Sequence, residues 1–212
     1  ALGRPALAEH LVAVTESADG ALGQVARDLH APVVHHPPVG GRYSVLSPVG
    51  LLPGYVAGVD VEGLVAGAAR MAEACLAEDL RDNPALWSAA AQYLHAEAGR
   101  TQSVSLPYYE RLDWVTQWFR QLWAESLGKL DGEGRSRGLT PVRALGATDQ
   151  HSQLQLYLQG PADKQFTLLM ADDLVHAGDR IPARWSEQSA IAPLAGHTVG
   201  ELLTAEFRAT RE

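Results

Sequence analysis

The sequence predicts an α/β fold in which a parallel sheet is flanked by helices. Short apolar runs typical of buried strands alternate with helical patterns along the 212 residues, and the first unit has the order β-α-β. The composition is 46% hydrophobic and 20% charged, which is enough apolar surface for one substantial core or for two. Because no repeat or low-complexity tract interrupts this order, we expect a single domain.

The bulk properties exclude several classes of protein. A net charge of −8 and a pI near 5.4 argue against non-specific nucleic-acid binding, which needs a basic surface. No apolar run approaches the roughly 20 residues that span a bilayer. We see no signal peptide and therefore expect a cytoplasmic location. Cys75 is the single cysteine, so an internal disulfide is excluded.

The amino-terminal part of the chain carries the β-α-β unit and three further helices. Apolar runs predict strands at 10–15 and 33–35, and a short helix is expected between them at 20–30. The further helices are expected at 47–58, 61–77 and 84–98. Asp60 and Asn83 can cap the second and third of them, whereas Pro53 should kink or shorten the first.

The carboxyl-terminal part predicts three more strands and three more helices. The strands are expected at 102–106, 139–145 and 165–170. The helices are expected at 108–127, 149–159 and 198–211. The segment 131–138 is expected to be a loop and 172–193 to be irregular. Thr198 and Glu201 have the spacing of a capping box at the start of the last helix.

Glu125 is the first candidate catalytic residue. Trp114, Trp118 and Leu122 form an apolar stripe at helical spacing, and Glu125 falls within that stripe. Gln121 lies one turn before Glu125 on the same side. A carboxylate there would lose hydration and become a stronger base, as general-base catalysis requires. The alternative is that the helix extends beyond the core and Glu125 is solvated.

His151 is the second candidate. It is expected in the first turn of its helix, after Thr148 or Asp149 as the cap. The positive end of the helix dipole disfavours the imidazolium, so the neutral ring could exchange protons. Together with Glu125 on a neighbouring element, it makes a candidate proton-transfer pair. The alternative is a surface histidine without a function.

Gly40, Gly41 and Arg42 lie between a strand and a helix. The glycines would let backbone approach a ligand, and the arginine offers a planar fork of donors for an anion. The alternative is a tight turn with a surface arginine. Neither a Walker loop nor a Gly-x-Gly-x-x-Gly follows the first strand, so no nucleotide is inferred. His35 and His36 have no cysteine or carboxylate at ligand spacing, so we expect no metal site.

Three long blocks resemble bacterial glucose-6-phosphate isomerases. Val-Gly-Gly-Arg-Tyr-Ser-Val-Leu-Ser-Pro-Val-Gly-Leu-Leu-Pro (39–53) resembles the arginine segment of that family. The block 118–129 resembles the segment with the catalytic glutamate. The block 140–164, with Gly-Ala-Thr-Asp-Gln-His-Ser at its centre, resembles the segment with the catalytic histidine. The similarity runs from about residue 10 to the final helix.

The resemblance implies a sugar-isomerase (SIS) fold, a flavodoxin-like parallel sheet, and reversible conversion of glucose 6-phosphate to fructose 6-phosphate. It implies that Glu125 moves a proton between C1 and C2 through a cis-enediol. Arg42 would stabilise the negative charge of that intermediate, and His151 would assist ring opening. Gln121 matches a glutamine near the substrate phosphate and the glutamate, and Gly41 would let backbone approach the sugar. No metal or organic cofactor is implied. Family members are homodimers in which the histidine reaches the partner's active site.

The resemblance also has departures. Pro37 and Pro38 stand where the family usually has an asparagine or a similar polar residue. The family's Ser-Lys-Thr phosphate loop, its first SIS domain and its carboxyl-terminal lysine segment have no counterpart here. We therefore expect 1–212 to be the second SIS domain of a longer chain, and the isolated fragment to be inactive.

Two alternative functions remain open at this point. One is a bifunctional isomerase that also accepts mannose 6-phosphate, or a fusion with another sugar-phosphate enzyme. The other is a sugar-phosphate-binding SIS module without turnover. The joint presence of Gln121, Glu125, Arg42 and His151 argues against the module, because binding alone needs no proton shuttle.

Overall fold

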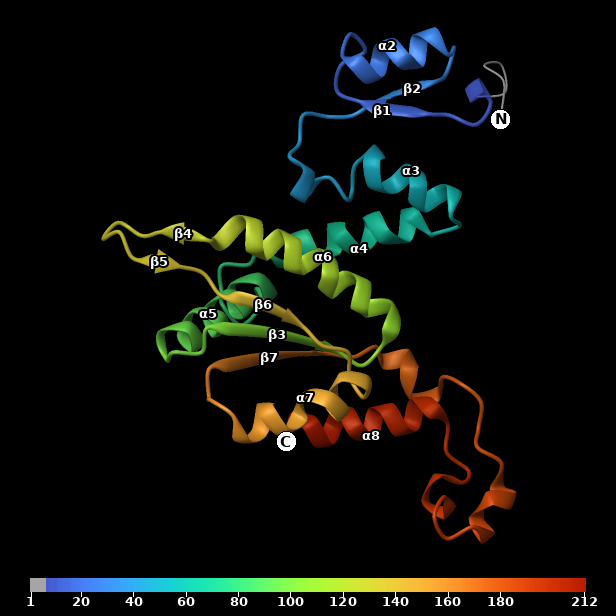
Figure 1. Cartoon of the computed structure of the whole chain (residues 1–212), viewed down its shortest axis with the longest axis vertical. Coiled ribbons are helices and arrows are strands. Elements are labelled where there is room, and N and C mark those ends of the chain that lie inside the picture. Colours follow the sequence, from blue (N-terminus) through green and yellow to red (C-terminus); the bar gives the residue numbers. More distant parts are fainter. Residues whose placement is uncertain (1–6) are drawn as a thin grey trace. The chain divides into compact units, whose positions relative to one another are not determined.

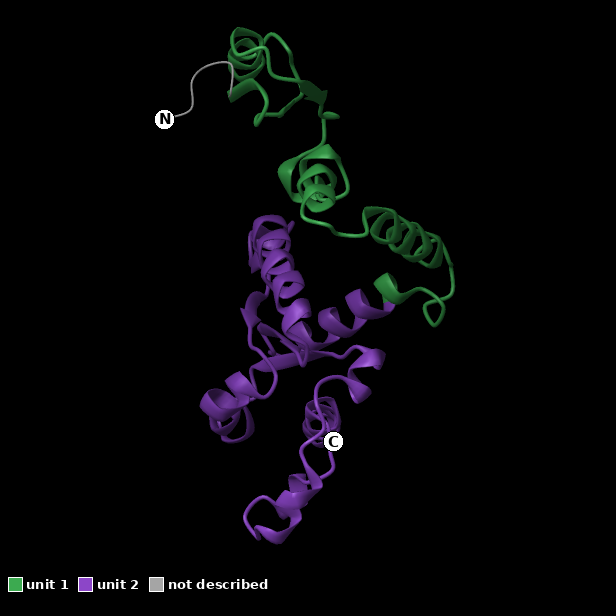
Figure 2. Cartoon of the chain, turned by 90° about the vertical axis from the view of Figure 1, so that its right-hand side faces the viewer, with its two compact units in different colours: residues 1–86 green, residues 87–212 purple. Residues whose placement is uncertain are grey.

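Parallel strands in two separate sheets, with helices on their flanks, make up the structure (Figure 1). It is a computed structural model in which residues 7–212 are described. The chain divides into two compact units, Ala1–Leu86 and Trp87–Glu212 (Figure 2). The predicted parallel α/β architecture is confirmed, whereas the strands form two parallel sheets rather than one. The assignment of 1–212 to one SIS domain stays a prediction.

The first unit begins with the predicted β-α-β motif. Its elements are β1 (Ala13–Thr15), α2 (Ala21–Asp28) and β2 (Val33–His35). The two strands are parallel, with Ala13 opposite Val33. Three buried alanines form the small core, Ala13, Ala26 and Ala31. Because alanine side chains are short, the helix can lie close to the strands.

The rest of the first unit is helical. It comprises the 3₁₀ turn η1 (Gly41–Tyr43), α3 (Pro48–Val56) and α4 (Val61–Ala74). Asp60 caps α4 as predicted, because its Oδ1 accepts a hydrogen bond of 2.9 Å from the backbone of Gly63. Pro53 lies inside α3, which continues to Val56, so the helix ends one turn after the proline.

The second unit contains a three-stranded parallel sheet of order β6-β3-β7. The strands are β3 (Gln102–Pro107), β6 (Thr140–Arg143) and β7 (Lys164–Leu169), and they are preceded by α5 (Pro84–Glu97). Gln102 pairs with Thr140 on one side and with Lys164 on the other. The central strand β3 is almost wholly buried, as expected for a strand that is covered on both faces.

Three long helices complete the second unit. They are α6 (Glu110–Leu127), α7 (Thr148–Gln159) and α8 (Val199–Arg211). Because α6 joins β3 to β6 and α7 joins β6 to β7 across β3, right-handed crossovers place α6 and α7 on opposite faces of the sheet (Figure 1). The core of this unit centres on Val104, Leu106, Tyr108 and Ala144. Phe207 of α8 packs edge-on against the Tyr108 ring.

Of the two segments expected to lack regular structure, the first contains a short hairpin. The expected loop at 131–138 is wrong in part, because a short antiparallel hairpin forms from β4 (Lys129–Leu130) and β5 (Ser136–Arg137). The Asp131 carboxylate organises its turn by accepting backbone hydrogen bonds of 2.9 Å from Glu133 and Arg135. These bonds and those from the Arg135 side chain hold the pKa of Asp131 well below its usual range.

The region 172–193 is irregular as predicted and contains short 3₁₀ turns, η2 (Asp172–His176), η3 (Ala183–Glu187) and, at its end, η4 (Ala192–Leu194). The capping box of α8 is confirmed. Thr198 accepts from the backbone of Glu201, and the Glu201 carboxylate accepts from the backbone of Thr198. Within residues 7–212, no helix is long and apolar enough to cross a membrane.

Candidate functional site

Glu125 lies near the carboxyl end of α6, and its side chain is exposed. The Gln121 amide donates a hydrogen bond of 3.0 Å to Glu125 Oε1 from one helical turn earlier. This bond restricts the carboxylate to one side of the helix. The pairing of these two residues, which the sequence placed one turn apart, is confirmed.

The apolar stripe of α6 does not face the core of the described chain. Trp114 is 71% exposed and Trp118 is 41% exposed, whereas Asp113 and Thr116 are the buried residues of the helix. The expected loss of hydration at Glu125 is therefore wrong. The reason is a polar contact that turns α6 toward the sheet through Asp113.

That contact is a bidentate ion pair between α6 and β6. Arg143 donates from Nε to Asp113 Oδ1 at 2.5 Å and from a terminal nitrogen to Asp113 Oδ2 at 2.7 Å. Gln117 adds a hydrogen bond of 3.2 Å to the same carboxylate. The hydrogen bonds from Arg143 hold the pKa of Asp113 below its usual value. Sequence reasoning missed this pair, although an arginine at the end of a strand next to a carboxylate in the first helical turn was a usable signal.

The carboxyl-terminal half of α6 is held at the other end of β6. The Trp123 indole donates a hydrogen bond of 3.0 Å to the Leu139 carbonyl, just before β6 begins. Asp113 meets Arg143, where β6 ends. Glu125 therefore lies at the amino end of the strands, about 18 Å along the helix axis from Asp113.

His151 lies at the opposite end of the strands, in the first turn of α7. It is exposed. The N-cap position is Ala147, not Thr148 or Asp149 as expected. The Asp149 carboxylate instead accepts a hydrogen bond of 2.6 Å from the backbone of Leu145, before the helix.

The turn before His151 is tightly determined. A Cβ atom on Gly146 would come within 2.6 Å of the Tyr108 ring, so only glycine fits there. Ala147 has φ 63° and ψ −58°, a strained conformation for a residue with a side chain. Both residues belong to the Gly-Ala-Thr-Asp-Gln-His-Ser block. The tight turn brings the start of α7 directly over the end of β6.

Gln150 locks this turn to the core. Its Oε1 accepts from the backbone of Ala147 at 3.2 Å and from the Tyr108 hydroxyl at 2.7 Å. Its amide donates to the Thr210 hydroxyl of α8 at 2.6 Å. Burial raises the pKa of Tyr108, so its hydroxyl stays a proton donor. The neighbouring His151 is thus presented to the outside from a fixed helix end.

Within the chain, the structure does not bring Glu125 and His151 together. They lie at opposite ends of the strands and on helices that cover opposite faces of the sheet (Figure 1). The expected proton-transfer pair within one chain is therefore not formed.

Arg42 belongs to the first unit, whereas Glu125 and His151 belong to the second. It lies in η1, is half-buried, and its guanidinium carbon is 5.8 Å from the centre of the Tyr43 ring. A Cβ atom on Gly41 would meet no atom within 4 Å, and Gly41 has no positive φ. Neither packing nor backbone conformation in the described chain requires glycine at this position.

His36 has a role that sequence reasoning missed. It is buried and lies 3.1 Å from the hydroxyl of Ser47, the N-cap of α3. Sequence reasoning considered it only as a metal ligand. Among residues 7–212, no group of three or more His, Cys, Asp or Glu side chains is placed to hold a metal ion.

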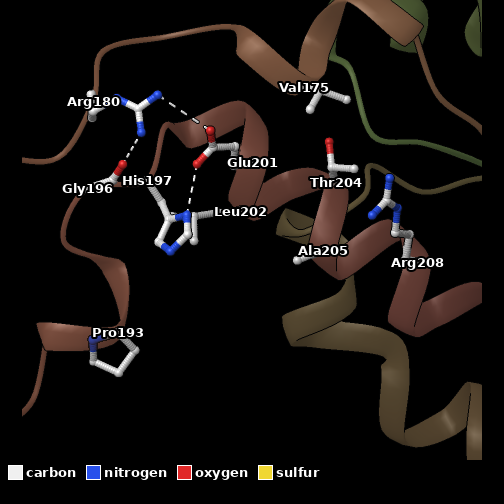
Figure 3. Close-up of a pocket in the computed structure, with 10 residues that line it drawn as sticks. All are labelled: Val175, Arg180, Pro193, Gly196, His197, Glu201, Leu202, Thr204, Ala205 and Arg208. Carbon is white, nitrogen blue, oxygen red and sulfur yellow. Dashed lines mark hydrogen bonds and ion pairs between the residues drawn. The ribbon is translucent and has the colours of Figure 1, made fainter.

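An open cavity of about 650 Å³ lies over the start of α8 (Figure 3). It contains none of the predicted site residues. Its charged side chains are largely paired with one another. Arg180 donates to the Gly196 carbonyl and lies 3.6 Å from Glu201, and His197 lies 2.8 Å from the same carboxylate. The hydrogen bond from His197 lowers the pKa of Glu201. These contacts close the segment before α8 onto the helix.

Comparison with known proteins gives one consistent family. The sequence profile of the family described as phosphoglucose isomerase matches residues 1–170. A protein of Carboxydothermus hydrogenoformans named glucose-6-phosphate isomerase is 44% identical over 208 residues, which are 95% of this chain and 44% of that protein.

Two solved structures are similar to this one. A hypothetical protein from Thermus thermophilus has a TM-score of 0.85 at 39% identity, over 96% of this chain and 48% of that chain. A glucose-6-phosphate isomerase from Chlamydia trachomatis has a TM-score of 0.73 at 27% identity, over 95% of this chain and 38% of that one. The chain thus spans less than half the length of these proteins.

Proposed function

Because the chain belongs to the phosphoglucose isomerase family, we propose that the full-length protein interconverts glucose 6-phosphate and fructose 6-phosphate through a cis-enediol. The observation that carries the proposal is the family match over residues 1–170, which include Arg42, Gln121, Glu125 and His151. The Carboxydothermus hydrogenoformans relative is named a glucose-6-phosphate isomerase, which favours neither the bifunctional enzyme nor the binding module.

The proposed roles follow from what the reaction needs. Moving a proton between C1 and C2 requires a positioned base and a group that stabilises the developing oxyanion. Glu125 acts as the base, and its hydrogen bond from Gln121 holds the carboxylate in one orientation. Arg42 supplies a planar fork of donors for the enediolate. His151 assists ring opening, and Gly41 lets backbone approach the sugar. These groups move the proton without a metal or an organic cofactor.

The proposed assembly is a homodimer in which His151 enters the active site of the partner. The separation of Glu125 and His151 within one chain supports it, because a histidine at the far end and on the far face of the sheet cannot serve its own glutamate. We also propose that residues 1–212 act as an SIS domain, that the protein is cytoplasmic, and that it serves glycolysis and gluconeogenesis.

The test is isomerase activity of the full-length protein and of its Glu125→Gln variant. Wild type should form fructose 6-phosphate in a coupled assay and should release part of a deuterium label from C2 to water. The amide keeps the shape of Glu125 but cannot accept the proton, so turnover should fall about 10²–10⁴-fold with little change in KM.

Glu110 is an exposed glutamate at the other end of α6. The variant Glu110→Gln is the matched control and should keep wild-type turnover. If Glu125→Gln keeps more than about a tenth of wild-type turnover, Glu125 is not the base. If wild type itself shows no activity, the proposed function is wrong.

A further inference from the structure

The segment that carries Arg42 is tied to the first sheet by a buried histidine. His36 directly follows β2, and its backbone N–H donates a hydrogen bond of 3.0 Å to the Thr15 carbonyl at the end of β1. The residue is only 7% exposed. Its Nε2 lies 3.1 Å from Oγ of Ser47, which is 8% exposed. The histidine therefore bridges the two ends of the exposed segment between β2 and α3.

The direction of this hydrogen bond follows from the single proton of the Ser47 hydroxyl. That proton is donated to the Ser44 carbonyl at 2.7 Å, so the Ser47 oxygen accepts from the N–H at Nε2 of His36. The Ser44 hydroxyl in turn donates to the Gly41 carbonyl at 2.8 Å. Three successive hydrogen bonds thus connect the end of β2 to the peptide that joins Gly41 to Arg42.

Backbone hydrogen bonds also shape the turns of the segment, for example from Tyr43 to the Gly40 carbonyl at 2.9 Å and from Ser47 to the Ser44 carbonyl at 2.9 Å, but these bonds are local to the segment. Pro37 and Pro38 follow His36 and have no N–H to donate. Farther along, Tyr43 is 66% exposed and Leu46 is 43% exposed. The Nδ1 atom of His36 faces the exposed carboxylate of Glu16 at 3.8 Å, which is beyond hydrogen-bonding distance. The contact with Ser47 is therefore the side-chain hydrogen bond through which His36 acts on the segment.

We propose that His36, acting through Ser47 and Ser44, is a positioning residue for Arg42. The inference rests on the proposed function, in which Arg42 stabilises the enediolate. An oxyanion-stabilising group is effective only when it is aligned before charge develops, and small displacements of such groups cost large factors in rate. The effect of losing His36 should consequently appear in kcat rather than in KM.

The test compares three variants of the full-length enzyme. His36→Leu removes the donor and keeps apolar bulk, and it should lower kcat on the order of tenfold or more with KM changed less than about twofold. His36→Gln keeps an N–H near the position of Nε2 and should restore at least about half of the wild-type kcat. His35→Leu makes the same substitution at the adjacent exposed histidine and should leave kcat unchanged.

A second measurement separates positioning from general destabilisation. If His36 acts through Arg42, then adding His36→Leu to Arg42→Lys should lower kcat less than it does in wild type. Ser44→Ala removes the last donor of the series without a change at the buried histidine, and it should lower kcat in the same way. It serves as the decisive variant if His36→Leu does not fold.

Failure of this inference and failure of the proposed function give different experimental results. An active wild type with unchanged kcat in His36→Leu or in Ser44→Ala overturns this inference alone. The inference is also overturned if the double variant loses kcat by the product of the factors lost in His36→Leu and in Arg42→Lys, because the two residues then act independently. Absence of isomerase activity in wild type overturns the proposed function, and the inference with it.

Discussion

Gly41 is the residue whose identity the fold of the described chain explains least. An added Cβ atom would meet nothing within 4 Å, and the backbone of Gly41 is in a conformation that any residue adopts. By contrast, Gly146 cannot carry a side chain because the Tyr108 ring occupies the space. Glycine is thus present in the first and the third block of family resemblance for different physical reasons. Gly146 is required by packing, and the proposed function assigns Gly41 to close approach of the sugar.

The Gly41→Ala variant tests this assignment. The melting temperature of the full-length protein should stay the same or rise slightly, because alanine fits the turn and restricts the unfolded chain by about 0.4–1 kcal/mol. Its kcat/KM should fall roughly tenfold or more, since a methyl group would occupy space that the sugar needs. Thermal unfolding and steady-state kinetics check the two halves of the prediction. Unchanged kcat/KM would remove Gly41 from the binding site, and a lower melting temperature would point to a structural role instead.

At the scale of elements, the ion pair between Asp113 and Arg143 decides how α6 lies on the sheet. A helix with tryptophans on one side would be expected to bury them, but the described α6 buries a carboxylate and a threonine. The carboxylate can be buried because Arg143 supplies two hydrogen bonds from the end of β6. The orientation of Glu125, at the other end of the same helix, depends on this contact.

Asp113→Asn should therefore destabilise the protein by about 2–3 kcal/mol, since it weakens a buried charged hydrogen bond and leaves Arg143 without its anion. Urea unfolding at neutral pH measures the difference. A loss below about 0.5 kcal/mol would show that the pair contributes no more than an exposed ion pair does.

We also expect the contribution of Asp113 to the free energy of unfolding to depend on pH. The folded-state pKa of Asp113 lies below its ordinary value of 3.8, so its contribution is present above that value. It is lost as the pH falls through the lower folded-state pKa. The stability difference between wild type and Asp113→Asn should thus be constant near neutrality and shrink in acid below about pH 4. A difference that grows in acid would contradict the assignment.

At the scale of the whole molecule, the separation of Glu125 and His151 predicts sharing of active sites between subunits. Each site of the proposed dimer takes its glutamate from one chain and its histidine from the other. A heterodimer of Glu125→Gln and His151→Ala chains would then contain one site with both native residues and one site with neither. Random assembly of equal amounts should restore about a quarter of wild-type activity, because half of the dimers carry one intact site.

Co-expression of the two full-length variants under different affinity tags allows the heterodimer to be isolated and assayed. The two parent homodimers, each lacking one residue at every site, are the controls. If the heterodimer is no more active than the parents, each site takes both residues from one chain, and the proposed exchange of His151 is wrong. Size-exclusion chromatography of wild type checks the dimer itself.

Local physical chemistry allowed most elements to be predicted from the sequence. The apolar period of the β-α-β unit, the caps at Asp60 and Thr198, and the glycine that ends α7 act within a few residues of one another. The spacing of Gln121 and Glu125 on one helical turn was likewise predictable, and their hydrogen bond forms. The three blocks of family resemblance were sufficient to predict the family.

The tertiary structure alone decided which faces and ends these elements present. A periodic pattern cannot reveal that Asp113 pairs with Arg143, thirty residues away in sequence, while Trp114 and Trp118 on the same helix stay exposed. Nor can it reveal that His36 bonds to Ser47, or that Glu125 and His151 lie at opposite ends of the strands. These arrangements depend on contacts between residues distant in the chain, and the free energies of such contacts depend on burial and pairing that exist only after the sheet has formed.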